Sequence, residues 1–497
     1  MPITFTESDE VNNPTATYIY SESRSKDGHG RLDALEPHSA SSREWFSAGI
    51  VKSLADIFLP AGYPHSVSDD YLPYQIFDSL QAFCSSIAGL LSSRAVLQGV
   101  GVGNATASPT TALLLHILQD SSGRLATILF AHRVGPALEP ECKTFRLAAD
   151  VFNDVAMVLD CVSPRVPAGT PRVGVLSAAG VLRALCGVAG GSSKASLSAH
   201  FARWGNIAEV NAKDSSQETI ISLVGMLVGS YAVSRITGSA ATWTALVVLL
   251  AAHLALNYAA VRAVQMTSLN RQRANIVFSA LLDSDPDLDL DLARRRRSHR
   301  RILTPAETSK REKIFARDGA LTWFSPSSSH GGIQLGHGLI GIDLPTFLQS
   351  PSTRSTTRTR TLKPSPNPNL GQLTTLFANE AYMLNLTHTG GGGWDGRIIL
   401  KPGCSAEARL KAWCHALLAA RVLSSSAADA GSVADAGPEK QDEGGGRVLG
   451  VISQTLDFLT GGDRFRQYCR GLREMGWDVE GAALETRAGR RVSWVDG

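Results

Sequence analysis

Hydrophobic positions dominate the chain from residue 45 to about residue 282, where helix-forming segments follow one another with few charges. The longest charge-free runs are the 16 residues between Glu218 and Arg235 and the 26 residues between Arg235 and Arg262. Apolar runs of this length, without strand-like alternation, are typical of buried or membrane-embedded helices. The pattern therefore predicts a mainly α protein with a multi-helix core.

Two segments of this core have the composition of membrane-spanning helices. Segment 242–261 supplies the roughly 20 predominantly apolar residues that a bilayer requires. Segment 220–234 is shorter, but Gly225 and Gly229 give it a small-residue face suited to close helix packing. We expect the two segments to form a helical hairpin with a turn at 237–239. Weaker candidate spans are 82–103, 109–119 and 173–191.

The same apolar pattern also fits a large soluble domain whose helices are fully buried. Insertion of at least one segment is favoured because charge-free spans of suitable length recur in series. Membrane lipids are then expected partners. The arginine-rich run 294–301 predicts an intracellular membrane with the C-terminal half on the cytosolic side. Alternatively, this run is a linker that contacts phospholipid head groups, or a localisation signal.

Polar stretches flank the core. Residues 1–44 are rich in Ser, Asp, Glu and Gly, and predict a loose tail with one short strand near 15–20. Residues 283–302 form a charged linker, acidic and then basic. Segments 350–369 and 424–446 are rich in small and polar residues, and are predicted to be disordered.

After residue 303 the pattern changes to short alternating and amphipathic segments. It predicts a small α+β C-terminal domain formed by 303–423 and 447–497. Ser405 is expected to cap the first of two helices. The expected elements are strands at 380–386 and 397–401, helices at 405–423 and 465–475, and a final hairpin at 481–495.

Composition narrows the choice of partners. Hydrophobic residues make up 43% of the 497 residues and charged residues only 19%, below the roughly 25% usual for soluble domains. The net charge of +3 is too small to indicate a nucleic-acid partner. The seven cysteines contain no CxxC pair and are odd in number, which predicts reduced, buried thiols rather than a disulfide framework or a zinc site.

Uncommon residues recur in a particular order at the start and end of segment 58–219. The segment contains FLPAGYPHSV at 58–67, DYLPYQ at 70–75, Asp78, and AKDSSQET at 212–219. This order resembles the root UVB sensitive (RUS) family, and we expect a member of the fungal type with a RUS C-terminal domain. The resemblance implies a role in vitamin B6 homeostasis and stress protection rather than a defined catalytic step.

Residues 206–218 concentrate polar side chains immediately before an apolar segment. Ionisable groups at the mouth of a hydrophobic bundle are costly unless they are paired or functional, which favours a ligand site. Lys213 and Gln217 would share one helix face. The candidate ligand-binding residues are Asn206, Lys213, Asp214, Gln217, Glu218, Tyr63, Asp70, Gln75, Asp78, His253 and Asn257.

Ordinary structural roles explain the same residues. Segment 206–218 can be a solvated, salt-bridged helix start with Asp214 as its cap. His253 and Asn257, four residues apart, can bond to each other in the core or line a cavity. The run GVAGGSSK at 187–194 lacks the glycine before the lysine that a phosphate-binding loop has, so it predicts a broken helix with a mobile joint.

Three functions follow from these patterns. The first is a membrane protein that binds or moves a small anionic metabolite. The second is a non-catalytic scaffold whose C-terminal domain recruits a protein partner or a paralogue. The third and weakest is a pyridoxal-phosphate enzyme with Lys213 or Lys194 as its reactive lysine. The chain contains no recognisable catalytic or metal-binding motif and identifies no cofactor, so an enzyme is not expected.

Overall fold

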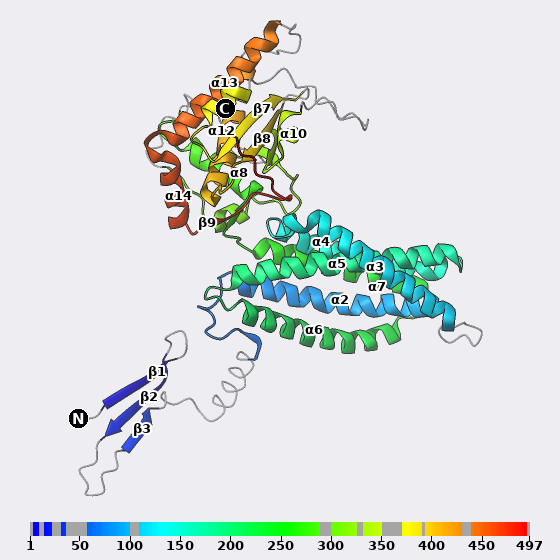
Figure 1. The fold of residues 1–497 in the computed structure, drawn as a ribbon. Helices are drawn as coiled ribbons and strands as arrows, with labels where there is room; N and C mark the ends of the chain where they lie inside the picture. Colours follow the sequence, from blue (N-terminus) through cyan, green and yellow to red (C-terminus); the bar gives the residue numbers. More distant parts are fainter. Residues whose placement is uncertain are drawn as a thin grey trace. The chain divides into compact units, whose positions relative to one another are not determined.

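The computed structural model describes residues 3–8, 14–21, 31–35, 57–99, 109–288, 300–325, 332–349, 370–389, 393–429 and 439–494. Contacts divide the chain into two compact units. Unit 1 comprises 1–127 and 146–264, and unit 2 comprises 128–145 and 265–497. The units are described separately below (Figure 1).

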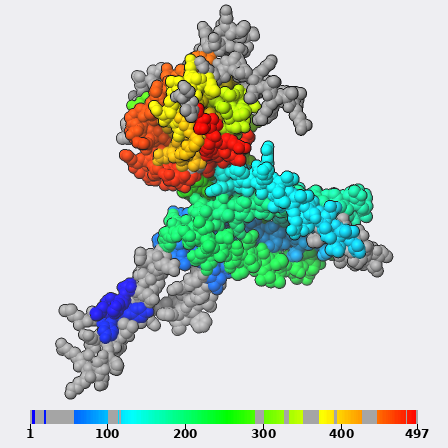
Figure 2. Space-filling view, viewed as in Figure 1, coloured from blue at the N-terminus to red at the C-terminus, as the bar shows by residue number. Residues whose placement is uncertain are grey.

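Unit 1 consists mainly of long helices that run side by side (Figure 1), and the space-filling view presents them in blue, cyan and green (Figure 2). The predicted multi-helix core is therefore confirmed. The weaker candidate spans fall within three of these helices, except for residues 100–103, which lie outside the described residues. The helices are α2 (Tyr71–Gly99), the first part of α3 (Pro109–Leu138), most of α4 (Cys142–Val162), α5 (Thr170–Phe201), α6 (Ile207–Arg235) and α7 (Ser239–Ala263).

Helix α2 is the packing partner of both α6 and α7. The small-residue face of α6 meets it closely, since a Cβ added at Gly225 would lie 2.8 Å from Ser86 Cβ. A Cβ at Gly229 would lie 2.8 Å from a methyl carbon of Leu90. Close packing through these glycines is confirmed. The expected turn at 237–239 is confirmed, since α6 ends at Arg235 and α7 begins at Ser239, but the expected packing of α6 against α7 is wrong, because the glycine face of α6 is turned toward α2.

Helix α5 continues without interruption through 187–194, so the predicted break is wrong. The serines of this run bond within the helix, and Ser193 Oγ donates to the carbonyl oxygen of Gly190 at 3.0 Å. A Cβ added at Gly190 would lie 3.6 Å from Ala149 Cβ, an ordinary contact with α4. Tertiary packing therefore overrides the low helix propensity of the glycines here.

The described N-terminal residues form a small three-stranded sheet instead of a loose tail with one strand, and the rest of 1–44 lies outside the described residues. Strand β2 (Pro14–Ser21) lies between β1 (Ile3–Ser8) and β3 (Arg31–Leu35), and both pairings are antiparallel. The expected strand near 15–20 is confirmed as β2. Its threonines, tyrosines and isoleucine favour extended structure, and pairing on both edges satisfies its backbone groups.

Unit 2 is a small α+β structure, as predicted. Its main sheet has the order β5–β6–β8–β7, in which β6 and β8 are parallel and the two outer pairings are antiparallel. The strands are β5 (Ala320–Trp323), β6 (Ile333–Ile340), β7 (Tyr382–His388) and β8 (Trp394–Leu400). The helices are α8 (Arg271–Asp283), α9 (Pro305–Ser309), α10 (Leu344–Leu348), α11 (Leu370–Leu376), α12 (Ala406–Asp429), α13 (Glu439–Thr460) and α14 (Arg464–Glu474).

The core of unit 2 lies where α8 and α12 pack against the sheet. Phe278 of α8 and Trp413 of α12 are fully buried. The Trp413 indole donates to Asn275 Oδ1 at 2.9 Å, and its ring lies over Gly338 of β6. A Cβ at Gly338 would come within 2.9 Å of that ring, so glycine is needed for this close approach. Helix α8, expected in the helical core, thus belongs to the sheet-containing unit.

The local predictions for unit 2 are mostly confirmed. The two strands and two helices expected in this unit correspond to β7, β8, α12 and α14, with bounds shifted by one to six residues. Ser405 Oγ accepts a bond from the Ala408 amide at 3.2 Å, as a capping serine does. Segment 350–369 lies outside the described residues.

Two predictions in unit 2 are wrong. The final hairpin is absent from described residues 478–494, where β9 (Asp478–Ala483) pairs in parallel with β4 (Ser268–Asn270). Helices α12 and α13 extend into 424–446 from both sides, which contradicts disorder at its two ends. The serines at the end of α12 bond back to helix carbonyls, for example Ser424 Oγ to Ala420 O at 2.8 Å.

Candidate functional site

Charged and polar side chains gather inside unit 1, and we call this set the polar cluster. Five helices contribute to it, and each contributes from the face turned toward its neighbours. Its members are Tyr74, Gln75 and Asp78 of α2, Arg146, Asp150 and Asp154 of α4, Lys194 of α5, Asp214 and Glu218 of α6, and His253 and Asn257 of α7.

Arg146 joins α4 to α2. Its guanidinium lies 2.5 Å from Asp78 Oδ1, donates through Nε to the Tyr74 hydroxyl at 3.1 Å, and lies 3.8 Å from Asp150 Oδ1. All four side chains are buried. A buried guanidinium is tolerated only when carboxylates and hydrogen bonds compensate for its lost hydration, as they do here.

The side chains of α7 turn toward the acids of α4. His253 Nδ1 lies 2.8 Å from Asp154 Oδ1, and Nε2 lies 3.6 Å from Asp150 Oδ2. Asn257 Nδ2 donates to Asp150, and Asn257 Oδ1 finds no partner among the described residues. His253 and Asn257 share a face as predicted. The expected bond between them is wrong, because the α4 carboxylates are the stronger acceptors.

Lys194 connects α5 to α6. Its Nζ lies 2.8 Å from Asp214 Oδ2 and 2.5 Å from Glu218 Oε2, while Gln75 of α2 donates to Asp214 Oδ1 at 3.0 Å. Asp214 is buried, but the Glu218 side chain is 44% exposed. Asp214 therefore ties α2, α5 and α6 together instead of capping α6, and Glu218 is the outer carboxylate of the lysine.

The remaining predicted residues lie outside the polar cluster. Lys213 Nζ donates to the Ile57 carbonyl at 3.0 Å and Gln217 Nε2 to the Phe58 carbonyl at 2.5 Å, so both residues hold the segment before α2. Asp70 pairs with His200, Tyr63 lies in a turn, and the side-chain atoms of Asn206 have no partner among the described residues.

Sequence reasoning missed three central residues, named Tyr74 only within a family motif, and weighed Lys194 only as the lysine of a phosphate-loop-like run or as a reactive lysine. Arg146, Asp150 and Asp154 are spaced four apart, which puts three ionisable groups on one face of an otherwise apolar helix. That spacing was the available signal. Tyr74 lies in the family motif at 70–75, but the motif did not indicate its partner, because its role depends on the position of Arg146.

The polar cluster is closed at its Lys194 end. The space bounded by Tyr74, Lys194, Phe201 and Asp214 holds no water-sized volume. Within the described ranges, no group of three or more His, Cys, Asp or Glu side chains is arranged to hold a metal ion. At its Lys194 end, therefore, the cluster consists of paired charges with no room for a water molecule.

Apolar helices surround these charges. Helices α2, α5 and α7 are long and apolar enough to cross a membrane, by length and composition. In their most hydrophobic stretches only 39%, 17% and 33% of the residues are buried within the protein. Most residues of these stretches are therefore at least partly exposed in the described chain.

The vitamin B6 photo-protection and homoeostasis domain model matches residues 45–285, a span that contains the whole polar cluster. Through this domain, the chain belongs to the RUS family. RUS family member 1 of Dictyostelium discoideum is 39% identical over 272 residues, which cover 54% of this chain and 49% of that protein. Protein root UVB sensitive 3 of Arabidopsis thaliana is 35% identical over 228 residues, or 46% of this chain and 51% of that protein.

A more distant match, Arabidopsis root UVB sensitive 2, described as chloroplastic, is 28% identical over 245 residues, which are 48% of this chain and 55% of the relative. The RUS chain described here thus spans about half the length of the curated relatives it matches. No solved structure matches it. The family resemblance seen in the motifs at 58–78 and 212–219 is confirmed.

Proposed function

We propose that this RUS protein is a membrane protein that serves vitamin B6 homeostasis and stress protection by binding or moving a small anionic metabolite at the polar cluster. Membrane insertion is supported by the uncovered apolar surface of unit 1. Leu125, Leu227 and Val248 are 63%, 65% and 61% exposed on three different helices. Such broad apolar exposure is costly in water and favourable against lipid.

The position of Lys194 carries the metabolite proposal. Ionisable residues among membrane helices are rare and are typical of substrate or ion pathways. Lys194 holds two carboxylates, one buried and one half exposed. An anion that replaced Glu218 would keep the lysine neutralised while Asp214 stayed in place, so this exchange requires the least rearrangement.

The topology forms part of the same proposal. Residues 294–299 lie outside the described residues, and the last two arginines of the run are engaged with acids, Arg300 with Asp285 at 3.0 Å and Arg301 with Glu307 at 3.3 Å. We expect an intracellular membrane with unit 2 on the cytosolic side, according to the positive-inside rule. Protease added to vesicles that expose the cytosolic face would then cleave within 350–369.

Complementation of a deletion strain tests the metabolite proposal. Lys194→Gln should abolish complementation while the protein still accumulates in alkali-resistant membranes, because the anion loses its cation. Lys194→Arg, which keeps the charge, should retain partial function and guards against misfolding as the explanation. Lys213→Gln is the matched control on α6, since Lys213 lies outside the polar cluster and its Nζ contacts a backbone carbonyl.

The second candidate is a non-catalytic scaffold that recruits a protein partner or a paralogue through unit 2. The closed geometry of the polar cluster favours it, because paired charges without a cavity also serve as a structural lock. Full complementation by Lys194→Gln at wild-type abundance would reject metabolite binding there and leave the scaffold. Recovery of the wild-type protein in the soluble fraction without detergent would reject both membrane proposals.

A further inference from the structure

A cavity of about 440 Å³ opens in unit 2 and shares no lining residue with the polar cluster. Its walls come from residues 137–145, from α8 and from segment 313–324. Cavities of roughly 300–1,000 Å³ are typical of small-molecule sites. The cavity is therefore large enough for a small metabolite, and its lining indicates which kind.

The charged groups of the lining favour an anion. Lys313 and Arg317 are exposed, and no described residue forms an ion pair with either side chain. Arg271 is buried and already committed, since it donates to Asp318 Oδ1 at 2.7 Å and to the Leu484 carbonyl at 2.7 Å. Two cations thus remain available on one short segment.

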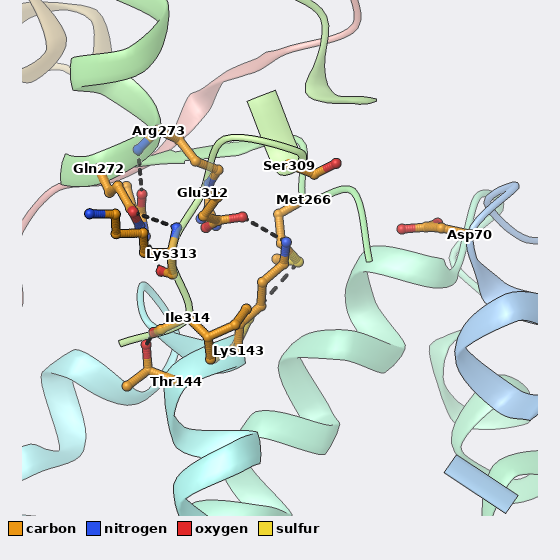
Figure 3. A network of polar contacts seen from close by, with 12 residues as sticks. Asp70, Lys143, Thr144, Met266, Gln272, Arg273, Ser309, Glu312, Lys313 and Ile314 are labelled. Carbon is orange, nitrogen blue, oxygen red and sulfur yellow. Dashed lines mark hydrogen bonds and ion pairs between the residues drawn. The ribbon is translucent and has the colours of Figure 1, made fainter. Parts of the chain in front are cut away.

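Polar contacts to α8 and to the start of α4 anchor that segment (Figure 3). Glu312 accepts from Lys143 at 2.6 Å and from Arg273 at 2.7 Å in a buried ion triad. Gln272 bonds both to the amide and to the carbonyl of Lys313, each at 2.8 Å, and Thr144 Oγ1 donates to the Ile314 carbonyl at 2.5 Å. A fixed backbone reduces the entropy lost when the adjoining cations bind a ligand.

Aromatic side chains complete the lining. Phe145, Phe315 and Phe324 contribute to the walls, and Phe315 is 59% exposed. An exposed phenylalanine at a cavity gains most when a flat ring covers it, because both apolar surfaces leave water. The cavity thus offers ring contacts next to two cations.

Glu141 adds a neutral donor. Burial is the main reason that its pKa is raised from 4.5 to about 7, with Glu312 and Asp318 raising it further while Arg273 and Arg271 oppose the shift. Asn270 Nδ2 donates to its Oε2 at 3.2 Å. Near neutral pH the carboxyl is protonated about half of the time, and in that form it can donate a hydrogen bond to an oxygen of a ligand.

We propose that this cavity binds a small phosphate monoester of an aromatic or heteroaromatic ring, with the phosphate at Lys313 and Arg317 and the ring against Phe315. A phosphate dianion matches two cations in charge, and arginine is well suited to phosphate oxygens. The family description names vitamin B6, and the phosphate esters of this pyridine vitamin belong to the proposed chemical class. The site does not depend on the proposal for Lys194, because it uses other residues in the other unit.

Calorimetric titration of the full chain in lipid nanodiscs tests the site, with phenyl phosphate as the probe. Inorganic phosphate lacks the ring and phenol lacks the anionic group. Each should therefore bind at least about tenfold more weakly than phenyl phosphate does. The double variant Lys313→Gln and Arg317→Gln should weaken phenyl phosphate by about tenfold or more. Phe315→Ala should weaken phenyl phosphate and leave inorganic phosphate unchanged.

The matched control is the double variant Lys310→Gln and Arg311→Gln, which removes the same charge from exposed positions outside the cavity lining. It should bind phenyl phosphate as the wild type does. Absence of phenyl phosphate binding to the wild type would overturn the proposal. The proposal would also be overturned if both double variants weakened phenyl phosphate binding equally. The same holds if inorganic phosphate bound the wild type as tightly as phenyl phosphate does. If Lys194→Gln still complements the deletion strain, only the proposal for the polar cluster is rejected, and the proposal for this cavity is unaffected.

Discussion

Helices α7 and α12 are both rich in apolar residues, yet their surroundings are opposite. In α12 every residue from Trp413 to Ala420 is fully buried, because the sheet lies on one side and α8 and α13 pack on others. In α7, Val247 and Val248 are 59% and 61% exposed. An apolar helix of a soluble fold is covered by protein on most sides, and α7 is not. We therefore propose that lipid covers the exposed side of α7.

The two units also surround a buried histidine differently. In unit 1, His253 faces two aspartates. In unit 2, His415 bonds only to neutral groups, the Tyr382 hydroxyl at 3.0 Å and the Ile452 carbonyl and Thr455 hydroxyl at 3.0 and 2.9 Å. Burial lowers the pKa of His415 to about 3. Unit 2 thus keeps this histidine neutral, as the interior of a soluble domain favours.

The largest expected effect comes from truncating the covered helix. Leu417→Ala should lower the free energy of unfolding of unit 2 by about 2–5 kcal/mol, because it leaves a cavity under the sheet. Leu227→Ala, at a 65% exposed position on α6, should change stability in detergent by less than about 0.5 kcal/mol. Native-state hydrogen exchange measures both. Similar losses for the two variants would remove the contrast between the units.

A charge on the uncovered helix tests which solvent surrounds it. Val248→Arg should cost roughly 2.5–3.5 kcal/mol of membrane insertion and release the protein on alkaline extraction. Met475→Arg, at a 42% exposed position after α14, should leave the extraction behaviour unchanged. If Val248→Arg instead behaves as the wild type does, α7 faces water.

The smallest expected effect concerns Glu141. Its pKa is raised from 4.5 to about 7, so the folded state holds the proton more tightly than the unfolded state does. The stability from this group is therefore complete below pH 4.5 and is lost as the pH rises through 7. Glu141→Gln should make the protein more stable than the wild type at pH 8, by about 1–3 kcal/mol, and not at pH 4.

Chemical unfolding of both proteins at several pH values measures this difference. Asp457→Asn is the matched control, because it removes the charge of an exposed carboxylate on α13. A stability difference for Glu141→Gln that is the same at every pH would contradict a raised pKa at this position.

Local features of unit 2 were predictable because they depend on neighbouring residues. The capping serine Ser405, the helix that follows it and the strand ending at Leu400 were all expected from spacing and propensity. The parallel pairing of β9 with β4 was not, since about 200 residues separate these strands along the chain. The continuity of α5 through its glycines likewise depended on packing, here against α4.

For the candidate site, too, some features could be predicted from the sequence and others could not. The sequence drew attention to Gln75, Asp78, Asp214 and Glu218 through the family motifs, and to His253 as a polar group in an apolar helix. It could not identify their partners. Asp78 meets Arg146, and Asp214 meets Lys194, only because separate helices turn these faces toward one another.

By itself the sequence determined the family, the helical core, the α+β character of the C-terminal part and the length of the apolar segments. These follow from periodicity and composition, which act over a few residues. The tertiary structure decided which charges are paired, which apolar faces remain uncovered, and where Lys313, Arg317 and Glu141 share a cavity. Such features arise only when distant segments pack, because burial and ion pairing depend on what each side chain meets rather than on its neighbours along the chain.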